Sequence, residues 1–370
     1  MHFGEPLDDE RLRALYRPDE LIRTVLTADV YGQGAADALL GRALVGLDRD
    51  AYCLVGAVGH DFYAGERQGP KGFPRFTDPA LRRPGEYASY LRMATERSLE
   101  RIGVDSFDLL LLHNPDRTGY SSEEVWDGMR ALRDERLTQL VGVAPGPANG
   151  FTLDLIDCFE RFGESIDWAM VILNPLEPWP GELVLPAAAR HDVKLITRVV
   201  DYGGLFHDDV LPGHEFPRFD HRSFRPGGWV EAGREKLERL RPIADRRGLT
   251  MLQLACEWNL AQAPVECVVP TLIQETGAGA KPVEAKREEL AAISRQPRDA
   301  DGRPRRSVLS AGEVAEIREI GDNANCMALK GASPEHEGDV LPDRWPLDDH
   351  LVGVAARWDI HPGEQLVQTH

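Results

Sequence analysis

The chain has 370 residues, of which 42% are hydrophobic, and this content suffices for a large packed core and excludes wholesale disorder. The formal net charge of −18 argues against nucleic acid or an anionic membrane as the main partner, so any anionic ligand needs a local basic site. Five scattered cysteines without metal-ligand spacing favour reduced thiols in a cytoplasmic protein, and no apolar run is long enough for a membrane span.

Strands and helices alternate over residues 1–295, which is typical of a parallel sheet with crossover helices. We predict strands at residues 2–3, 23–27, 52–58, 107–112, 140–143, 168–173, 193–198 and 267–272. We predict helices at residues 8–16, 34–45, 85–102, 122–134, 152–162, 181–191, 230–247, 251–261 and 282–294. Eight such units indicate the α/β class and a (β/α)8 TIM barrel.

Two long loops and a C-terminal tail complete the predicted organisation. Residues 61–84 are too long for a plain connector and are predicted to form a functional lid, and residues 201–226 form a second long loop. Residues 296–370 contain a charged linker, a helix at 310–321 that Ser310 can cap, and a helix at 347–358. This tail is expected to pack on the barrel wall; the alternative is a flap over the mouth that carries Met327 and Lys330.

One predicted strand runs directly into a histidine. The apolar run at 107–112 leads into His113, Asn114, Pro115 and Asp116. Barrel enzymes keep their reacting groups at the carboxyl ends of the strands, and an imidazole can donate or accept a hydrogen bond near neutral pH. We therefore predict that His113 contacts the substrate; the alternative is a core histidine satisfied by the backbone.

These residues carry a resemblance to the aldo-keto reductases. Residues 108–115 match the family's "DLLLLH-x-P" segment, and LTADVYGQGAADALLGRAL is similar to "DTA-x-x-YG…E-x-x-LG-x-AL". The resemblance covers about residues 20–320 and implies the barrel, a small carbonyl or sugar-like substrate, and NADP(H) as cofactor. It also implies that Tyr31 is the general acid that protonates the carbonyl oxygen; the alternative for Tyr31 is a packing or gating aromatic.

The chain departs from the family at the two residues that polarise this tyrosine. The family places an aspartate five residues before the tyrosine, where this chain has Leu26, and a lysine at the end of the third strand, where it has Ala57. The chain thus resembles a divergent member that lacks the usual Asp and Lys of the catalytic tetrad. His60, three residues after the lost lysine, is predicted to polarise Tyr31 or to act as a base.

The cofactor positions are altered as well. The family holds the nicotinamide amide with Ser-Asn after strand five and Gln in strand six, where this chain has Ala144, Pro145 and Met170. Each lost hydrogen bond costs about 1 kcal/mol unless another group compensates. In the loop before residue 282, where the family holds the NADP phosphate, a glycine-rich helix start carries three cations. These predicted cofactor-binding residues are Lys281, Lys286 and Arg287; the alternative is a solvated helix start.

Polar residues after strands six and seven are predicted to bind a polyhydroxylated or carboxylated substrate, namely Asn174, Arg198, Asp201 and Tyr202. The alternative is an Arg198–Asp201 ion pair. The histidines and acids of the 201–226 loop match no known ligand spacing, so no metal site is predicted.

Two functions remain open. The first is an NADP(H)-dependent oxidoreductase on a carbonyl or sugar-like small molecule, implied by the resemblance. The second is a non-redox lyase or isomerase that transfers protons with Tyr31, His113 and His60 and binds no nicotinamide. A non-catalytic binding protein is a third possibility, and the sequence leaves the oligomeric state open.

Overall fold

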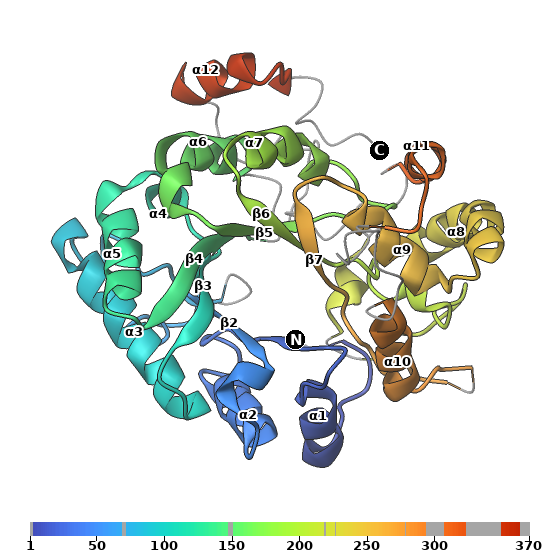
Figure 1. Ribbon diagram of the computed structural model, residues 1–370, viewed down its shortest axis with the longest axis horizontal. Helices are drawn as coiled ribbons and strands as arrows, with labels where there is room; N and C mark the ends of the chain where they lie inside the picture. Colours follow the sequence, from blue (N-terminus) through green and yellow to red (C-terminus); the bar gives the residue numbers. More distant parts are fainter. Residues whose placement is uncertain are drawn as a thin grey trace.

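Seven parallel strands form one curled sheet in the order β1 to β7, with helices around its outside (Figure 1). The computed structural model describes residues 3–68, 72–146, 151–217, 220–225, 227–277, 279–293, 307–322 and 349–362. The strands are β1 (Thr24–Leu26), β2 (Cys53–Val58), β3 (Phe107–His113), β4 (Thr138–Ala144), β5 (Trp168–Ile172), β6 (Lys194–Arg198) and β7 (Val265–Val269). All seven correspond to predicted strands, so the prediction of an α/β barrel is confirmed.

Nine of the described connecting helices correspond to predicted helices, and one short helix, α4 (Arg117–Ser121), was not predicted. The helices of the barrel are α1 (Asp9–Tyr16), α2 (Ala35–Leu44), α3 (Tyr87–Ile102), α4 (Arg117–Ser121), α5 (Glu123–Asp134), α6 (Thr152–Phe162), α7 (Leu185–Arg190), α8 (Trp229–Arg247), α9 (Met251–Leu260) and α10 (Val283–Ile293). Within the described ranges, no helix combines the length and apolar character that a bilayer crossing requires.

The period-two alternation of the strands separates two apolar clusters. In β3, Leu110 and Leu112 face the outer helices, whereas Leu109 and Leu111 face the barrel axis. The axial cluster is built from small and aliphatic side chains, namely Ala28, Val55, Ala57, Leu109, Leu111, Ala144, Met170 and Ile196. The barrel interior is therefore a packed apolar core, and polar chemistry is left to the ends of the strands.

The predicted first strand at residues 2–3 is described only at its second residue. His2 lies outside the described residues, and Phe3 lies in a bend. The backbone N–H of Gly4 donates to Asp220 and that of Glu5 donates to the carbonyl of Gln274, so this segment bonds to two loops instead of a strand ladder. A cavity of about 570 Å³ lies between β1 and β7, the two ends of the described sheet.

Two further helices lie outside the barrel helices. In α11 (Ala311–Ile320), Ser310 caps the first turn and Glu313 pairs with Arg247 of α8. In α12 (Asp349–Arg357), Arg357 pairs with Glu160 of α6, and Figure 1 shows α12 outside α6 and α7. The described parts of the tail thus pack on the barrel wall. Met327 and Lys330, the residues of the alternative flap, lie outside the described residues.

Candidate active site at the carboxyl ends of the strands

Tyr31 and His113 meet at the carboxyl-terminal end of the sheet. Tyr31 lies in the turn after β1, and His113 is the last residue of β3. Their ring centroids are 5.7 Å apart and the rings are nearly perpendicular, at 87°. Tyr31 is 53% exposed and His113 is 7% exposed, so a ligand can reach the phenol while the imidazole forms the wall behind it.

His60 is brought to the same place by a glycine. Gly59 allows the end of β2 to approach β3 closely, because a Cβ at this position would lie 2.5 Å from the carbonyl oxygen of His113. The His60 and His113 ring centroids are 5.1 Å apart at an angle of 68°. The imidazole of His60 therefore contacts that of His113.

Both ring nitrogens of His60 have partners within the protein. Nδ1 lies 3.0 Å from the carbonyl oxygen of Phe73, and Nε2 lies 3.1 Å from the side-chain amide nitrogen of Asn114. In the tautomer with a proton on Nδ1, Nδ1–H donates to Phe73 and Nε2 accepts from Asn114, whereas in the other tautomer Nδ1 accepts from Arg75. Asn114 holds this position at a φ of 47°, which Asn tolerates better than most residues. This arrangement fixes the orientation of the His60 ring.

Burial keeps both imidazoles neutral near pH 7. Burial, with a contribution from the charge of Arg75, lowers the pKa of His60 to about 4. Burial also lowers the pKa of His113 well below its usual value, helped by His60, Arg198 and Arg75. Nδ1 of His113 is buried and has no hydrogen-bond partner in the described structure. His113 thus offers a neutral ring that can bond to a substrate oxygen.

Two arginines from different parts of the chain flank the histidines. Arg75 comes from the 61–84 loop and donates through Nε to the carbonyl of Asn114, while its Nη1 lies 3.0 Å from Nδ1 of His60. Arg198 is the last residue of β6 and donates to the carbonyl of Pro145 at 2.7 Å. Burial lowers the pKa of both guanidinium groups. The mouth therefore concentrates positive charge in an acidic protein.

The 61–84 loop is fastened to the barrel in its described part. The buried Asp61 pairs with Arg82 at 2.6 Å, and Phe76 stacks on Tyr90 of α3. Its predicted role as a lid remains a prediction, but its contribution of Arg75 to the mouth is a structural fact.

The positions that are polar in the resembling family form one apolar surface here. Ala57, Ala144 and Met170 belong to the axial cluster, and Leu26 packs against it. The losses noted in the sequence are therefore contiguous in space. The described residues at these positions offer no side chain that could polarise the Tyr31 hydroxyl or bind a carboxamide.

Three of the four predicted substrate-binding residues are fully buried: Asn174, Asp201 and Tyr202. Asn174 donates to the carbonyl of Val199 and accepts from the N–H of Leu176. Asp201 accepts from the N–H groups of Gly204 and Thr271, so the alternative ion pair with Arg198 is wrong. The polar atoms of Asn174 and Asp201 fix loops, and substrate contact by the four residues stays a prediction.

The three predicted cofactor-binding cations have carboxylate partners. Lys281 pairs with Glu289 at 2.6 Å, and Arg287 pairs with Asp19 at 2.7 Å. Lys286 is fully buried, pairs with Asp209 at 2.7 Å and donates to the carbonyl of Ile273. A phosphate at this loop would have to displace these partners, and the assignment stays a prediction.

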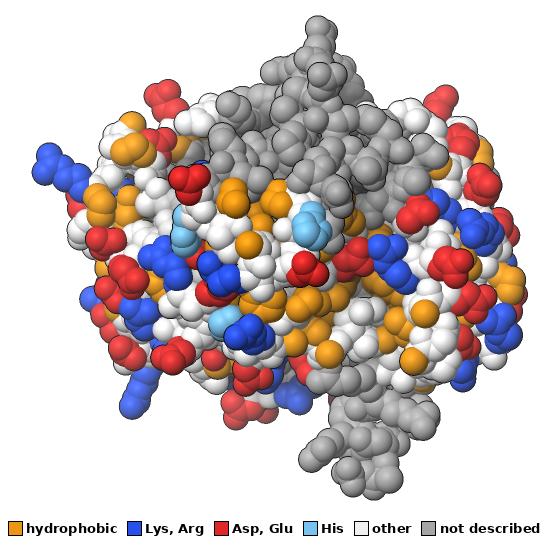
Figure 2. All heavy atoms as spheres, turned by 90° about the horizontal axis from the view of Figure 1, so that it is seen from above, with side chains coloured by type: hydrophobic (Ala, Val, Ile, Leu, Met, Phe, Trp, Pro, Cys, Tyr) orange, Lys and Arg blue, Asp and Glu red, His pale blue; other side chains and the backbone are white. Residues whose placement is uncertain are grey.

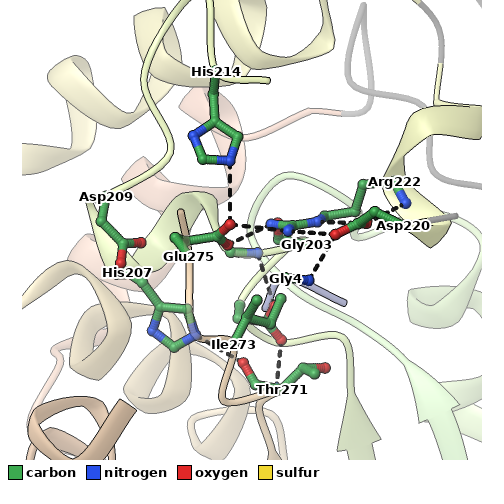
Figure 3. A network of polar contacts seen from close by, with 12 residues as sticks. Gly4, Gly203, His207, Asp209, His214, Asp220, Arg222, Thr271, Ile273 and Glu275 are labelled. Carbon is green, nitrogen blue, oxygen red and sulfur yellow. Dashed lines mark hydrogen bonds and ion pairs between the residues drawn. The ribbon is translucent and has the colours of Figure 1, made fainter. Parts of the chain in front are cut away.

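A buried ion network fills the space beside the same loop (Figure 3). Arg222 lies between Asp220 and Glu275, at 2.8 and 2.5 Å, and all three side chains are inaccessible to solvent. Asp220 accepts from the N–H of Gly4, and His214 lies 3.3 Å from Glu275. The network ties the N-terminal segment to the loops after β6 and β7. Within the described residues, no group of three or more His, Cys, Asp or Glu side chains could hold a metal ion.

Comparison with known proteins identifies the family. The model of the aldo/keto reductase family matches residues 9–276. The chain belongs to the aldo/keto reductase family. Curated relatives include D-threo-aldose 1-dehydrogenase of Pseudomonas sp, 25% identical over 277 residues, which are 71% of this chain and 79% of the relative. A probable voltage-gated potassium channel subunit beta of Arabidopsis thaliana is 23% identical over 74% of this chain and 81% of its own length.

Solved structures of aldo/keto reductase members share the fold. Glycerol dehydrogenase from Gluconobacter oxydans aligns with a TM-score of 0.61 and 23% identity over 86% of each chain. The holo form of an aldo-keto reductase from Bacillus halodurans aligns with a TM-score of 0.58 and 22% identity over 88% of this chain and 92% of its own. The curled sheet of this chain is therefore the (β/α)8 barrel of the aldo/keto reductase family.

Sequence reasoning missed two residues of the mouth. Arg75 lies inside a loop whose Gly, Pro and aromatic content gave no indication of which side chain would turn inward. Asn114 was visible as the residue after His113, but its bond to His60 joins two strand ends and depends on their spacing. The available signal was position in the chain, since the carboxyl ends of neighbouring parallel strands lie at the same edge of the sheet.

Proposed function

We propose that this protein is an enzyme that acts on the carbonyl group of a small, sugar-like molecule, with Tyr31 exchanging a proton with the carbonyl oxygen. The observation that carries the proposal is the exposed phenol of Tyr31 placed edge-on to the neutral imidazole of His113. Membership of the aldo/keto reductase family makes interconversion of a carbonyl and an alcohol the first candidate reaction.

The two residues take different roles in this proposal. The Tyr31 hydroxyl donates its proton as negative charge develops on the carbonyl oxygen, and takes the proton back in the reverse direction. The His113 imidazole hydrogen-bonds to the same oxygen and orients it, because burial keeps the ring uncharged. His60 and Asn114 position the His113 ring from behind.

NADP(H) is the cofactor that the family implies, and solved members include complexes with NADP and NADPH. The described residues do not fit nicotinamide in the family's manner. Leu26, Ala57, Ala144 and Met170 provide an apolar surface instead of polar partners. The cations at the loop after β7 are paired, and the Arg222 network lies beside them. NADP(H) use is therefore the least supported part of the proposal.

A second candidate function is favoured by that apolar surface. A lyase or isomerase would use Tyr31 and His113 to move protons at and beside the carbonyl, with His60 completing the set, and would need no hydride donor. The joint loss of amide-binding and tyrosine-polarising side chains is the specific observation behind this candidate.

One paired experiment tests the proposal and separates the two candidates. Purified protein is titrated with NADPH by calorimetry, and it is incubated with a panel of aldoses and ketoses in D₂O, with and without NADPH, and followed by NMR. Alcohol formation that requires NADPH supports oxidoreduction. Deuterium incorporation beside the carbonyl without NADPH supports proton transfer. If no panel member gives alcohol formation or deuterium incorporation, the proposed carbonyl chemistry is contradicted.

A further inference from the structure

We infer that the substrate carries a carboxylate and that Arg198 binds it, so that the ligand class is a sugar acid. This inference rests on the proposed function, because the same ligand has to present its carbonyl group to Tyr31 and His113. The nearby Arg75 adds a second positive charge to the same region.

Arg198 lacks the carboxylate partner that several other largely buried cations have. Arg225, whose guanidinium lies over the rings of Tyr202 and Trp229, also takes part in no ion pair among the described residues. Within the described residues, neither Arg198 nor Arg75 takes part in an ion pair. Four other largely buried cations do so at 2.5–2.9 Å, namely Arg82, Arg101, Arg222 and Lys286. Nε of Arg198 is buried without an acceptor. A buried guanidinium with an unused donor is costly unless a ligand supplies the missing acceptor.

Two carboxylates act electrostatically on the two arginines, but neither forms an ion pair with them. Glu177 influences the pKa of Arg198 through its charge, and Asp116 influences that of Arg75. Asp116 is bonded to Thr77 and to the N–H of Gly119, and it caps α4. Both acids therefore act on the arginines through their charge alone. They reduce the local positive potential, but neither accepts a hydrogen bond from Nε–H of Arg198.

The space beside Arg198 suits a small planar anion. A cavity of about 50 Å³ is lined by Arg198, Pro145 and Gly146 and by aliphatic side chains that include Val171 and Ile172. A planar guanidinium matches a carboxylate in geometry, and aliphatic walls strengthen the electrostatic attraction by excluding water. We therefore favour a carboxylate over a bulkier phosphate.

Arg198 also acts on one of the reacting groups, because its positive charge helps to lower the pKa of His113. The whole chain has a formal net charge of −18, and acidic and basic side chains are interspersed on the face seen in Figure 2. The field of the whole protein thus repels an anion, and local binding by the mouth arginines has to overcome that repulsion.

The test compares matched ligands that differ at one carbon. Binding of D-glucuronate, D-galacturonate and D-mannuronate to the full chain is measured by calorimetry against the parent hexoses and the hexose 6-phosphates. We expect at least one uronate to bind tenfold or more tightly than its parent hexose, with the preference falling as salt is added. The inference is overturned if the uronate and its parent hexose bind equally well. It is also overturned if the phosphate binds more tightly than the uronate, or if no compound binds.

Variants separate recognition from structure. Arg198→Met should remove the preference for the acid while leaving affinity for the neutral hexose within about twofold, and Arg198→Lys should keep part of the preference because it keeps the charge. Arg246→Met, at an exposed pair with Glu316, is the matched control and should retain the full preference. An unchanged preference in Arg198→Met overturns the inference even if the variant is less stable. If Arg198→Met does not fold, a reduced preference in Arg198→Lys supports the inference and an intact preference refutes it.

The same data distinguish failure of this inference from failure of the proposed function. Uronate that binds through Arg198 but shows neither reduction nor deuterium exchange leaves the inference standing and contradicts the function. Equal turnover of hexose and uronate leaves the function standing and contradicts the inference.

Discussion

The phenol of Tyr31 stands at 87° to the imidazole of His113, with the ring centroids 5.7 Å apart, although 81 residues and the whole of β2 separate them in the chain. The contact places the half-exposed phenol of Tyr31 next to the buried, uncharged imidazole of His113. Barrel topology makes this possible, because every parallel strand delivers its last residue to the same edge.

Removing the Tyr31 hydroxyl should abolish turnover without harming the fold. Tyr31→Phe is expected to lower kcat by at least about 100-fold, which is the usual contribution of a positioned proton donor. Its thermal midpoint should change little, because the side chain is half exposed. Tyr52→Phe, at a buried tyrosine remote from the mouth, serves as the control and should keep full activity. Full activity in Tyr31→Phe would remove this residue from the mechanism.

Protonation of His60 should destabilise the fold in acid. The pKa of His60 is about 4 in the folded protein and near 6.5 when unfolded, so below pH 6.5 the unfolded state binds the extra proton and stability falls as pH drops. His60 alone accounts for about 3 kcal/mol between pH 6.5 and 4. Urea unfolding across this range should show a shallower loss for His60→Gln than for wild type. His361→Gln, at an exposed histidine, should follow wild type, and parallel curves for all three proteins would contradict the assignment.

Loss of Arg222 should be severely destabilising. Arg222→Met leaves Asp220 and Glu275 buried without their cation, and breaking such a pair costs about 3–5 kcal/mol. The control Arg246→Met breaks only an exposed pair with Glu316 and should cost no more than about 1 kcal/mol. Equal urea midpoints for the two variants would show that the network contributes nothing to stability.

Asp29 and Asp37 should respond oppositely to the same substitution. Both are fully buried, but neither oxygen of Asp29 accepts a hydrogen bond of standard geometry, whereas Asp37 accepts from Thr27, Ser98 and Arg101. Burial raises the pKa of Asp29 well above its usual value, and the charge of Asp37 adds to the shift. The folded state therefore holds this proton more tightly than the unfolded state does, and Asp29 costs stability as pH rises above about 4.

The measurement is urea unfolding at pH 5 and pH 8. Asp29→Asn should stabilise the protein at pH 8 by at least about 1 kcal/mol, with a smaller gain at pH 5. Asp37→Asn should destabilise it at pH 8, because Arg101 loses its buried counter-ion. A destabilised Asp29→Asn variant at pH 8 would show that the ionised carboxylate has a stabilising partner.

Local pattern in the sequence was enough to place seven strands and the barrel helices. Alternating apolar runs and helix periods are set by neighbouring residues, so the run at 107–112 could be read as a strand that ends at His113. The same logic placed Tyr31 and Arg198 at strand ends. Phe3, the described residue of the predicted strand at 2–3, lies in a bend, and the next two residues bond to distant loops.

Side-chain partnership was decided by the tertiary structure alone. His60 was predicted to polarise Tyr31 or to act as a base, and this role stays a prediction. The contact of its ring with His113 was not predicted, because it depends on Gly59, which lets the two strand ends meet. Lys286 was predicted to bind a phosphate, but it forms an ion pair with Asp209, which lies on a loop far away in sequence. Residue type and position along a strand are local properties of the chain, whereas the pairing of a charged side chain depends on long-range packing. Among the described residues, that packing leaves Arg198 without a carboxylate partner.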